Sequence, residues 1–550
     1  MRMKVSDYIA RKLVDEGISD VFMVTGGGAM HLDDGLGHEP GLHCTFNHHE
    51  QACAIAAECY ARIHNKIAAV CVTTGPGGTN AITGVVGGWL DSIPMLILSG
   101  QVRYDTTARS TGLGIRALGD QEFEITKAID CMTKYCEMVI DPMRIRFCLE
   151  KALYLAQTGR PGPCWLDIPL NVQGAYVETE ELLGFDKNDY EAGGTGWSVH
   201  GSGCDGCGLC AGKLIQGKPA MIPEDEAGKG EKRELLPPSV SLDLAREIVK
   251  KVREAKRPVI NAGNGIRIGK AFDVFQRVVE MLGIPVVTGW NSLDCMYDSH
   301  PLYVGRAGHM GDRPGNFAVQ NCDLLLSLGS RLSIRQVGYN YPTWAREAYV
   351  IYNDIDAEEL KKPTVHVDMP VHADVKDLLE KMEMVLEVEA VSADGGPKDK
   401  EAVDWWISRC QQWKEKYPVV LPKHYEAGED QPANIYAAIK EISRRAEEDQ
   451  ITVVGNGSPC VVGGHAYEMK KGQRFISNSA IASMGYDLPA AIGACLADHT
   501  KDIILVTGDG SIQMNLQELQ TIIHNHLPIK IFLINNGGYH SIRQTQKNFF

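Results

Sequence analysis

The sequence predicts an α/β protein made of three doubly wound parallel-sheet domains. Short apolar runs of strand length alternate with segments of helical spacing along most of the chain. Glycine and polar residues directly follow several of these runs, as they do at the ligand-binding carboxyl ends of parallel strands. The length of 550 residues suits about three to four domains. Together these observations favour several sheets of similar design in one chain.

The first domain is predicted over residues 1–175. Its apolar residues recur at helical spacing from Val5 to Glu16, so a helix is expected there. Continuous apolar runs that end in Gly- or Thr-rich turns are typical of buried parallel strands. Such strands are expected at residues 21–24, 67–72 and 95–98.

A change of composition separates the first domain from the rest of the chain. Residues 190–237 are rich in Gly, Cys, Pro, Lys and Glu, which is typical of a linker or an inserted loop. A second, central α/β domain is predicted over residues 238–390 and a third domain over residues 402–550. Their buried strands are expected at residues 258–260, 285–287, 324–329, 503–506 and 529–534.

The most informative motif lies in the third domain. Gly508-Asp509-Gly510-Ser511 follows the predicted strand at 503–506, and Asn535-Asn536 follows the strand at 529–534. The spacing between the two motifs accommodates a strand, a crossover helix and the next strand. Mg²⁺ prefers hard oxygen ligands, and Asp509 and Asn536 each offer one. The pattern therefore predicts a magnesium site at this edge of the sheet.

The charge balance and the lack of targeting signals limit the classes of partner. Lys and Arg total 55 against 70 Asp and Glu, a formal charge of −15, which disfavours nucleic acid and anionic membranes as partners. The sequence has no apolar run long enough for a membrane span and no apolar segment typical of a signal peptide near Met1. A cytoplasmic location is expected, with single cysteines as core residues in a reducing compartment. These cysteines include Cys53, Cys71, Cys164 and Cys495.

The motif of the third domain resembles the diphosphate-binding motif of thiamine diphosphate enzymes, GDG followed by NN. A distant part of the chain agrees, since residues 47–52 and 56–62 resemble the HEQ and AEGYAR segments of the acetolactate synthase-like branch. The resemblance implies a pyrimidine-binding, a central and a diphosphate-binding domain. It runs from about residue 5 to the end of the sequence, and further matching segments are 75–80, 91–95 and 485–491.

The resemblance also implies which residues act on the cofactor. The carboxylate of Glu50 would hydrogen-bond to a ring nitrogen of the aminopyrimidine and so activate the cofactor. General acid–base catalysis of this kind raises a reaction rate by about 10²–10⁴-fold. Gly27 and Gln121 are the other implied catalytic residues. The side chain of Met484 would support the bent conformation of the cofactor. The carbonyl of Ala482 would accept a hydrogen bond from the amino group of the cofactor.

The remaining implied contacts hold the cofactor and its metal ion. The implied magnesium ligands are Asp509, Asn536 and Gly538. The implied cofactor-binding residues are Gly26, Thr74, Asn80, Gly455, Gly457, Ala482, Met484, Gly508, Gly510 and Ser511.

The implied reaction is decarboxylation of a 2-keto acid followed by carboligation to a second carbonyl compound. One alternative is a decarboxylase without ligation, or a C–C hydrolase, on the same cofactor, and another is an inactive binding subunit. In the family the activating glutamate and the GDG site come from different subunits, which implies a homodimer or homotetramer. The family continues beyond the point that matches Phe550, so the third domain is expected to be incomplete.

Two departures from acetolactate synthases point to a more polar substrate pocket. Asp120 stands where these enzymes carry Phe, although Gln121 is kept, and Thr545 stands near the position of a pocket tryptophan. A hydroxylated or sugar-like acceptor is therefore a hypothesis.

Two further cofactors are left open by the sequence. Relatives often bind FAD in the central domain, but the turn at 261–265 has only two glycines and reads equally well as an ordinary strand-to-helix turn. Cys204, Cys207 and Cys210 have the CxxCxxC spacing of an iron–sulfur or zinc site, foreign to the family, with an exposed loop as the alternative. The choice between an iron–sulfur cluster and zinc is open.

Overall fold

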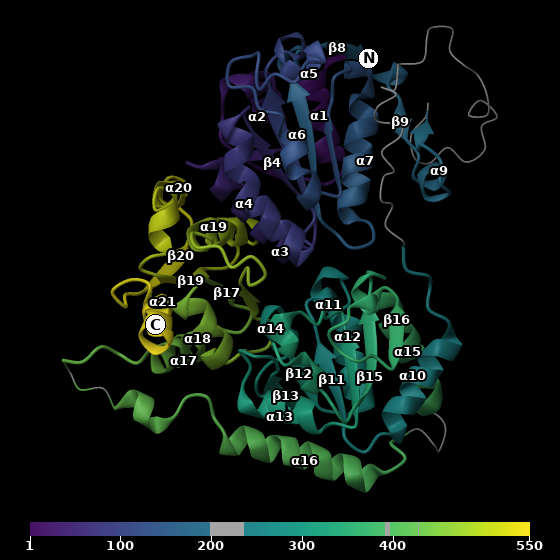
Figure 1. The fold of residues 1–550 in the computed structure, drawn as a ribbon, viewed down its shortest axis with the longest axis vertical. Helices are drawn as coiled ribbons and strands as arrows, with labels where there is room; N and C mark the ends of the chain where they lie inside the picture. The colour runs from purple at the N-terminus through teal and green to yellow at the C-terminus, as the bar shows by residue number, and fades with distance from the viewer. Residues whose placement is uncertain (199–235, 391–395, 427, 429) are drawn as a thin grey trace. The chain divides into compact units, whose positions relative to one another are not determined.

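The computed structural model describes residues 1–198, 236–390, 396–426, 428 and 430–550. Contacts divide the chain into two units (Figure 1): an N-terminal unit, Met1–Ala61 with Lys66–Leu235, and a second unit, Arg62–Asn65 with Leu236–Phe550. The described residues form one parallel sheet in the N-terminal unit and two in the second. These sheets and their flanking helices confirm the predicted fold class.

The sheet of the N-terminal unit is parallel and has the strand order β3-β2-β4-β5-β7-β6. The four inner strands are wholly buried, as continuous apolar runs in a parallel sheet should be. The strands are β2 (Asp20–Met23), β3 (His43–Phe46), β4 (Ala68–Val72), β5 (Met95–Gln101), β6 (Tyr135–Met138) and β7 (Pro163–Pro169), and short antiparallel pairs join β1 (Arg2–Lys4) to β8 (Tyr176–Glu178) and β9 (Gly184–Phe185) to β10 (Trp197–Ser198).

Helix α1 (Val5–Asp15) confirms the helix expected from residue 5 to within one residue of its end. It buries Val5, Ile9 and Leu13, which share one face because their spacing matches the helical period. The other helices of this unit are α2 (Met30–His38), α3 (Glu50–His64), α4 (Pro76–Asp91), α5 (Ala108–Thr111), α6 (Ile125–Ile129), α7 (Ile145–Gln157), α8 (Leu170–Gln173) and α9 (Lys187–Glu191).

The first sheet of the second unit is also parallel and forms the central domain, with the order β13-β12-β11-β14-β15-β16. Its apolar residues form one cluster with α10, α12 and α15 and another with α13 and α16. The strands are β11 (Pro258–Ala262), β12 (Val286–Thr288), β13 (Tyr303–Arg306), β14 (Leu324–Leu328), β15 (Tyr349–Asp354) and β16 (Met369–His372), and the helices are α10 (Leu242–Glu254), α11 (Gly265–Ile268), α12 (Phe272–Leu282), α13 (Arg313–Asn321), α14 (Ile334–Val337), α15 (Val375–Ala390) and α16 (Lys400–Lys416).

The last sheet has the order β18-β17-β19-β20, again all parallel. Because β17, β19 and β20 are neighbours, the segments that follow them meet at one edge of the sheet. The strands are β17 (Ile451–Val454), β18 (Arg474–Ile476), β19 (Ile503–Gly508) and β20 (Ile529–Ile534), and the helices are α17 (Ile435–Arg445), α18 (Ser458–Ala466), α19 (Asp487–Ala497), α20 (Glu518–His524) and α21 (His540–Phe549).

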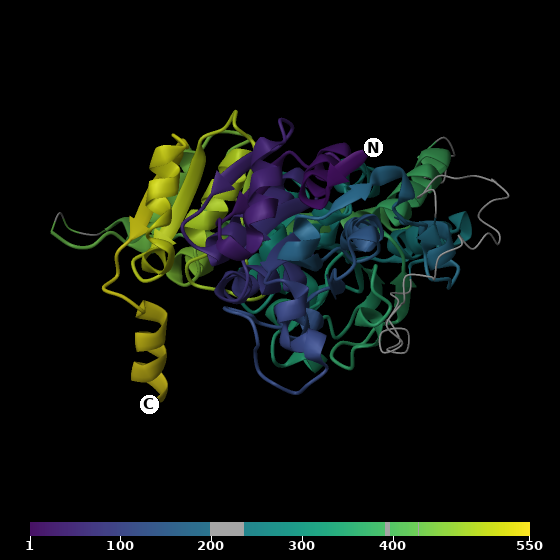
Figure 2. The same cartoon turned by 90° about the horizontal axis from the view of Figure 1, so that it is seen from above.

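Strand β20 is present as predicted, but it is not buried. Residues 530–533 are exposed because β20 lies at the edge of its sheet, where β19 is its one partner strand in the described part of the chain. None of the residues of α21 is buried, and Figure 2 shows this helix standing away from the sheet. No helix among the described residues is long and apolar enough to cross a membrane.

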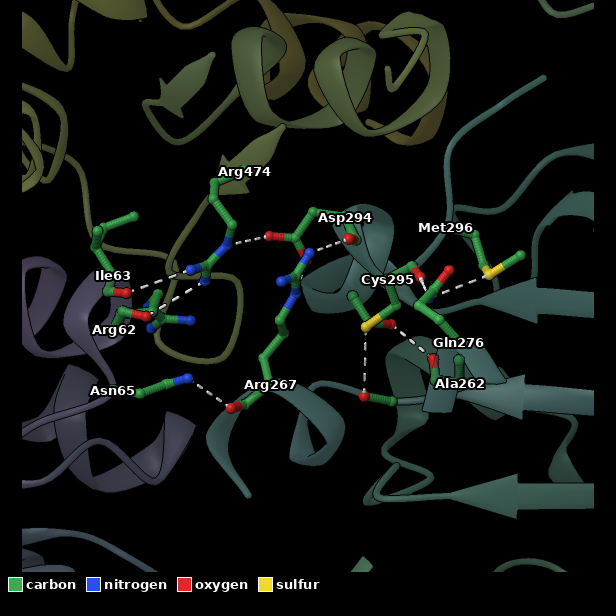
Figure 3. Close-up of polar contacts among 12 residues, drawn as sticks. Arg62, Ile63, Asn65, Ala262, Arg267, Gln276, Asp294, Cys295, Met296 and Arg474 are labelled. Carbon is green, nitrogen blue, oxygen red and sulfur yellow. Dashed lines mark hydrogen bonds and ion pairs between the residues drawn. The ribbon is translucent and has the colours of Figure 1, made fainter. Parts of the chain in front are cut away.

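A buried ion cluster joins the two sheets of the second unit. Figure 3 shows Asp294 between two guanidinium groups: Arg474 Nε donates to Asp294 Oδ2 at 2.6 Å, and Arg267 Nε lies 3.6 Å from Oδ1. Burial opposes ionisation of Asp294, but the two arginines together hold its pKa below the usual value. The cluster ties β18 to the 3₁₀ helix at Trp290–Cys295 and so fixes one sheet against the other.

Candidate active site

Glu50 and Asn80, which the resemblance assigns separately to catalysis and to cofactor binding, contact each other in the N-terminal unit. Glu50 is the first residue of α3 and is half-buried. The amide Nδ2 of Asn80, on α4, donates to Glu50 Oε2 at 2.9 Å. A Cβ at Gly77 would stand 3.7 Å from Glu50 Oε1 and only 2.9 Å from Thr73 Cγ2, so Gly77 and Thr73 border that oxygen. One carboxylate oxygen is thus anchored by Asn80, and the other has no hydrogen-bond partner among the described residues.

The glycine loop after β2 leaves one backbone N–H group for a ligand. Gly26 N donates to Asp33 Oδ2 at 3.1 Å, and Gly28 N donates to Thr73 Oγ1 at 3.0 Å. In the described part of the chain the N–H of Gly27 has no acceptor, and no heavy atom lies within 4 Å of the place where its Cβ would stand. Gly27 is therefore the loop residue that can donate to a bound oxygen.

Thr74 belongs to a buried polar network. Its hydroxyl donates to Gln101 Oε1 at 2.7 Å, and Gln101 Nε2 donates to Asp167 Oδ2 at 3.0 Å. Ser99 Oγ donates to the other oxygen of Asp167 at 2.6 Å. Because the single hydroxyl proton of Thr74 is engaged inside the protein, this side chain can offer a cofactor only its oxygen lone pairs and its methyl group.

Burial of Asp167 should make stability depend on pH. Desolvation raises the pKa of Asp167 to about 7, so between about pH 4 and pH 7 the folded chain binds a proton that the unfolded chain has lost. Stability should fall as the pH rises through this window. Asp167→Asn removes the titrating group. Between pH 5 and pH 8 the free energy of unfolding of the wild type should therefore fall by about 2 kcal/mol more than that of the variant. Urea unfolding at both pH values checks this, and equal losses in the two proteins would contradict it.

Gln121 lies against the start of α4. A Cβ at Gly75 would stand only 2.4 Å from the carbonyl oxygen of Gln121, and Gly75 has a φ of +62°, so this close approach requires glycine. The loop around Gln121 is organised by the next residue: Glu122 accepts from the backbone N–H groups of Ala108, Leu118 and Gly119. The side chain of Gln121 is exposed and available to a ligand.

Asp509 and Asn536 meet at the carboxyl edge of the last sheet, which the GDG and NN spacing predicts. Asp509 Oδ2 accepts from the backbone N–H groups of Gly538 at 2.8 Å and Asn536 at 3.2 Å. The side-chain Oδ1 of Asn536 is buried and has no hydrogen-bond partner among the described residues. An unpaired buried oxygen is costly, so a donor or cation is expected to face it. A carboxylate next to an unpaired amide oxygen is a donor set that fits Mg²⁺.

The start of α18 borders this pair. Gly457 precedes the helix with a φ of +94°, which favours glycine. The hydroxyl of Ser458, the first helical residue, accepts from Asn536 Nδ2 at 3.3 Å. The helix start and the Asn536 turn therefore lie side by side. Free N–H groups at a helix start suit an anion such as a diphosphate.

Met484 and Ala482 lie on the segment before α19. The methyl group of Met484 is 3.2 Å from the place where a Cβ of Gly510 would stand, so Met484 borders the GDG turn. Ala482 has a φ of +56°, and its carbonyl accepts from Asn456 Nδ2. A carbonyl has two lone pairs, so the carbonyl of Ala482 can accept a second hydrogen bond.

Three residues that organise the site are missed by the sequence interpretation: Asp33, Asn456 and Asp487. Asp33 fixes Gly26, and Asn456 fixes Ala482. Asp487 is the one acid in the apolar segment 487–497, and a buried acid in such a segment is a signal that could have found it.

The predicted extra cofactor sites stay predictions. Cys204, Cys207 and Cys210 lie outside the described residues, so the iron–sulfur or zinc hypothesis is untested, and no group of three or more metal-ligating side chains occurs among the residues that are described. In the central domain, Gly265 N donates to Gly329 O at 2.9 Å, so the turn at 261–265 packs directly on the segment that follows β14.

Three domain families of thiamine pyrophosphate enzymes match the chain in order. The N-terminal TPP binding domain matches residues 3–122, the central domain residues 245–382, and the C-terminal TPP binding domain residues 455–550. The fold and the site define an α/β enzyme that depends on thiamine diphosphate.

Acetolactate synthase large subunits are similar over nearly the whole chain. The protein from Lactococcus lactis is 30% identical over 99% of this chain and 83% of the relative. A probable acetolactate synthase large subunit from Methanococcus aeolicus is 30% identical over 100% of this chain and 83% of the relative. The acetolactate synthase isozyme 3 large subunit of Escherichia coli is 29% identical over 98% of this chain and 83% of the relative. The chain belongs to the thiamine pyrophosphate enzyme family, in its acetolactate synthase-like branch.

Proposed function

We propose that the chain uses thiamine diphosphate and Mg²⁺ to decarboxylate a 2-keto acid and to join the remaining acyl carbon to a second carbonyl compound. The observation that carries the proposal is the pair at the edge of the last sheet. There the Asp509 carboxylate lies beside the unpaired, buried Oδ1 of Asn536. The acetolactate synthase relatives support the class of reaction.

The residues at this edge fit a magnesium diphosphate. Asp509 and Asn536 would supply side-chain oxygens to the cation, and Gly538 a backbone oxygen. Gly457 and the start of α18 would face the phosphate groups, since N–H groups at a helix start favour anions. Gly508 and Gly510 keep the turn narrow enough for close approach, with Met484 beside it.

Bound thiamine diphosphate supplies the electron sink for decarboxylation and carbon–carbon bond formation. Glu50 would hydrogen-bond to a ring nitrogen of the aminopyrimidine through Oε1, while Asn80 fixes Oε2. The N–H of Gly27 donates to an oxygen of the substrate. Gln121 orients the substrate from the loop that packs against Gly75.

The proposal includes a polar acceptor and an oligomer. Asp120 and Thr545 are both exposed and would make the substrate surface more polar than the aromatic residues of acetolactate synthases. A homodimer or homotetramer is proposed because the family places its activating glutamate and its GDG site on different subunits.

A product assay tests the reaction. Pyruvate is given to the protein with thiamine diphosphate and Mg²⁺, with and without an added aldehyde or ketone, and CO₂ and products are followed by NMR. We expect CO₂ release and a ligated hydroxyketone or hydroxyketo acid. Free acetaldehyde alone would favour a non-ligating decarboxylase. No CO₂ from pyruvate or other 2-keto acids, with the cofactor bound, would indicate an inactive binding subunit.

A further inference from the structure

Asp487 lies where three segments of the proposed diphosphate site meet. The residue begins α19 and is only 1% exposed. Its Oδ1 accepts from Ser511 Oγ at 3.1 Å, and its Oδ2 accepts from the hydroxyl of Thr507. A Cβ at Gly455 would stand 2.5 Å from the same Oδ2. One buried carboxyl therefore contacts the segment after β17, the end of β19 and the turn that follows Asp509.

The contacts of Asp487 change the role expected for Ser511. A serine hydroxyl carries one proton, and Ser511 donates it to Asp487. The oxygen of the same hydroxyl accepts from Gly485 N at 2.9 Å, and Ser511 is only 2% exposed. The side chain of Ser511 therefore links two protein segments and has no proton to donate to a phosphate.

The link from Ser511 extends to the residue that borders the GDG turn. Gly485 is held on both sides, because its N–H donates to Ser511 and its carbonyl accepts from Asn515 Nδ2 at 2.7 Å. Met484 directly precedes Gly485. Asp487 thus fixes, through Ser511, both the turn that contains Asp509 and the segment that contains Met484.

We propose that Asp487 is a positioning residue that sets the affinity of the diphosphate site by holding Gly455, Thr507 and Ser511 in register. This inference rests on the proposed function, because it concerns the same magnesium diphosphate. Outer-shell partners that orient ligands typically change affinity by about 10- to 100-fold when they are removed. Asp487→Ala should therefore raise the Kd of the site for magnesium diphosphate groups by about 10- to 100-fold.

The test measures binding in the full chain with two probes, thiamine diphosphate and inorganic pyrophosphate, each with Mg²⁺. Asp487→Ala should weaken the binding of both probes. Asp487→Asn keeps one acceptor oxygen in place and should recover most of the affinity. Ser511→Ala removes the links of Ser511 to Asp487 and to Gly485 but leaves the contacts of Asp487 with Thr507 and Gly455, so it should weaken the binding of both probes by a smaller factor. This variant keeps the proposal testable if Asp487→Ala fails to fold.

Asp498→Asn is the matched control. Asp498 follows the other end of α19 and also accepts from a threonine hydroxyl, that of Thr500 at 2.5 Å, so its replacement should leave both Kd values unchanged. If wild type binds neither probe, the proposed function fails. If wild type binds both probes and Asp487→Ala and Ser511→Ala bind them equally well, only the positioning role of Asp487 is overturned. A purely structural role would lower the melting temperature without changing either Kd.

Discussion

Glu50→Gln is expected to slow hydrogen–deuterium exchange at C2 of bound thiamine diphosphate by about 10²-fold or more. Glutamine has nearly the same shape and keeps an oxygen that can accept from Asn80, so fold and cofactor affinity should change little. What glutamine lacks is the carboxylate that activates the cofactor in the proposed mechanism. Exchange is measured by NMR after acid quenching of the loaded protein.

Glu16→Gln provides the control for this substitution. Glu16 is exposed at the end of α1 and pairs with Lys12, so neutralising it changes the charge of the same unit without touching the site. The control should exchange at the wild-type rate. Near-normal exchange in Glu50→Gln would remove Glu50 from the mechanism.

Asp509→Ala is expected to abolish the Mg²⁺ dependence of cofactor binding and to raise the Kd of thiamine diphosphate by about 10²-fold, since interactions of charged groups contribute about 3 kcal/mol. The substitution removes a cation ligand and also the acceptor of two backbone N–H groups, those of Asn536 and Gly538. Calorimetric titration with and without Mg²⁺ measures both effects.

Two variants separate these contributions of Asp509. Asp509→Asn keeps an acceptor for the N–H groups of Asn536 and Gly538 but lacks the negative charge. The conformation of the turn should therefore be preserved, while cofactor binding should lose most of its Mg²⁺ dependence. Asp502→Ala removes an exposed acid just before the other end of β19 and should bind as wild type does. An unchanged Mg²⁺ dependence in Asp509→Ala would exclude Asp509 as the ligand.

Much of the fold could be predicted because continuous apolar runs carry the information. The strands β4, β11, β14 and β19 are such runs, and they are buried where the sequence places them. The exposure of β20 could not be predicted, because an apolar run does not reveal whether a strand lies inside a sheet or at its edge.

The site was only partly predictable, for a related reason. Asp509 and Asn536 follow strand ends, where sequence order and sheet topology bring residues together. The buried partners do not follow such a rule. Thr74 and Ser511 look like ligand-binding hydroxyls in the sequence, but their protons go to Gln101 and Asp487, which only the packing of distant segments reveals.

Whether the chain holds a magnesium-bound diphosphate is tested most directly by a calorimetric titration of the unmodified chain with thiamine diphosphate, once with Mg²⁺ and once with a chelator. We expect saturable binding at a single kind of site with Mg²⁺ and binding weaker by about 10²-fold or more without it, because the diphosphate needs the cation held by Asp509 and Asn536. Equal affinity in the two titrations, or no binding with Mg²⁺, would contradict this expectation.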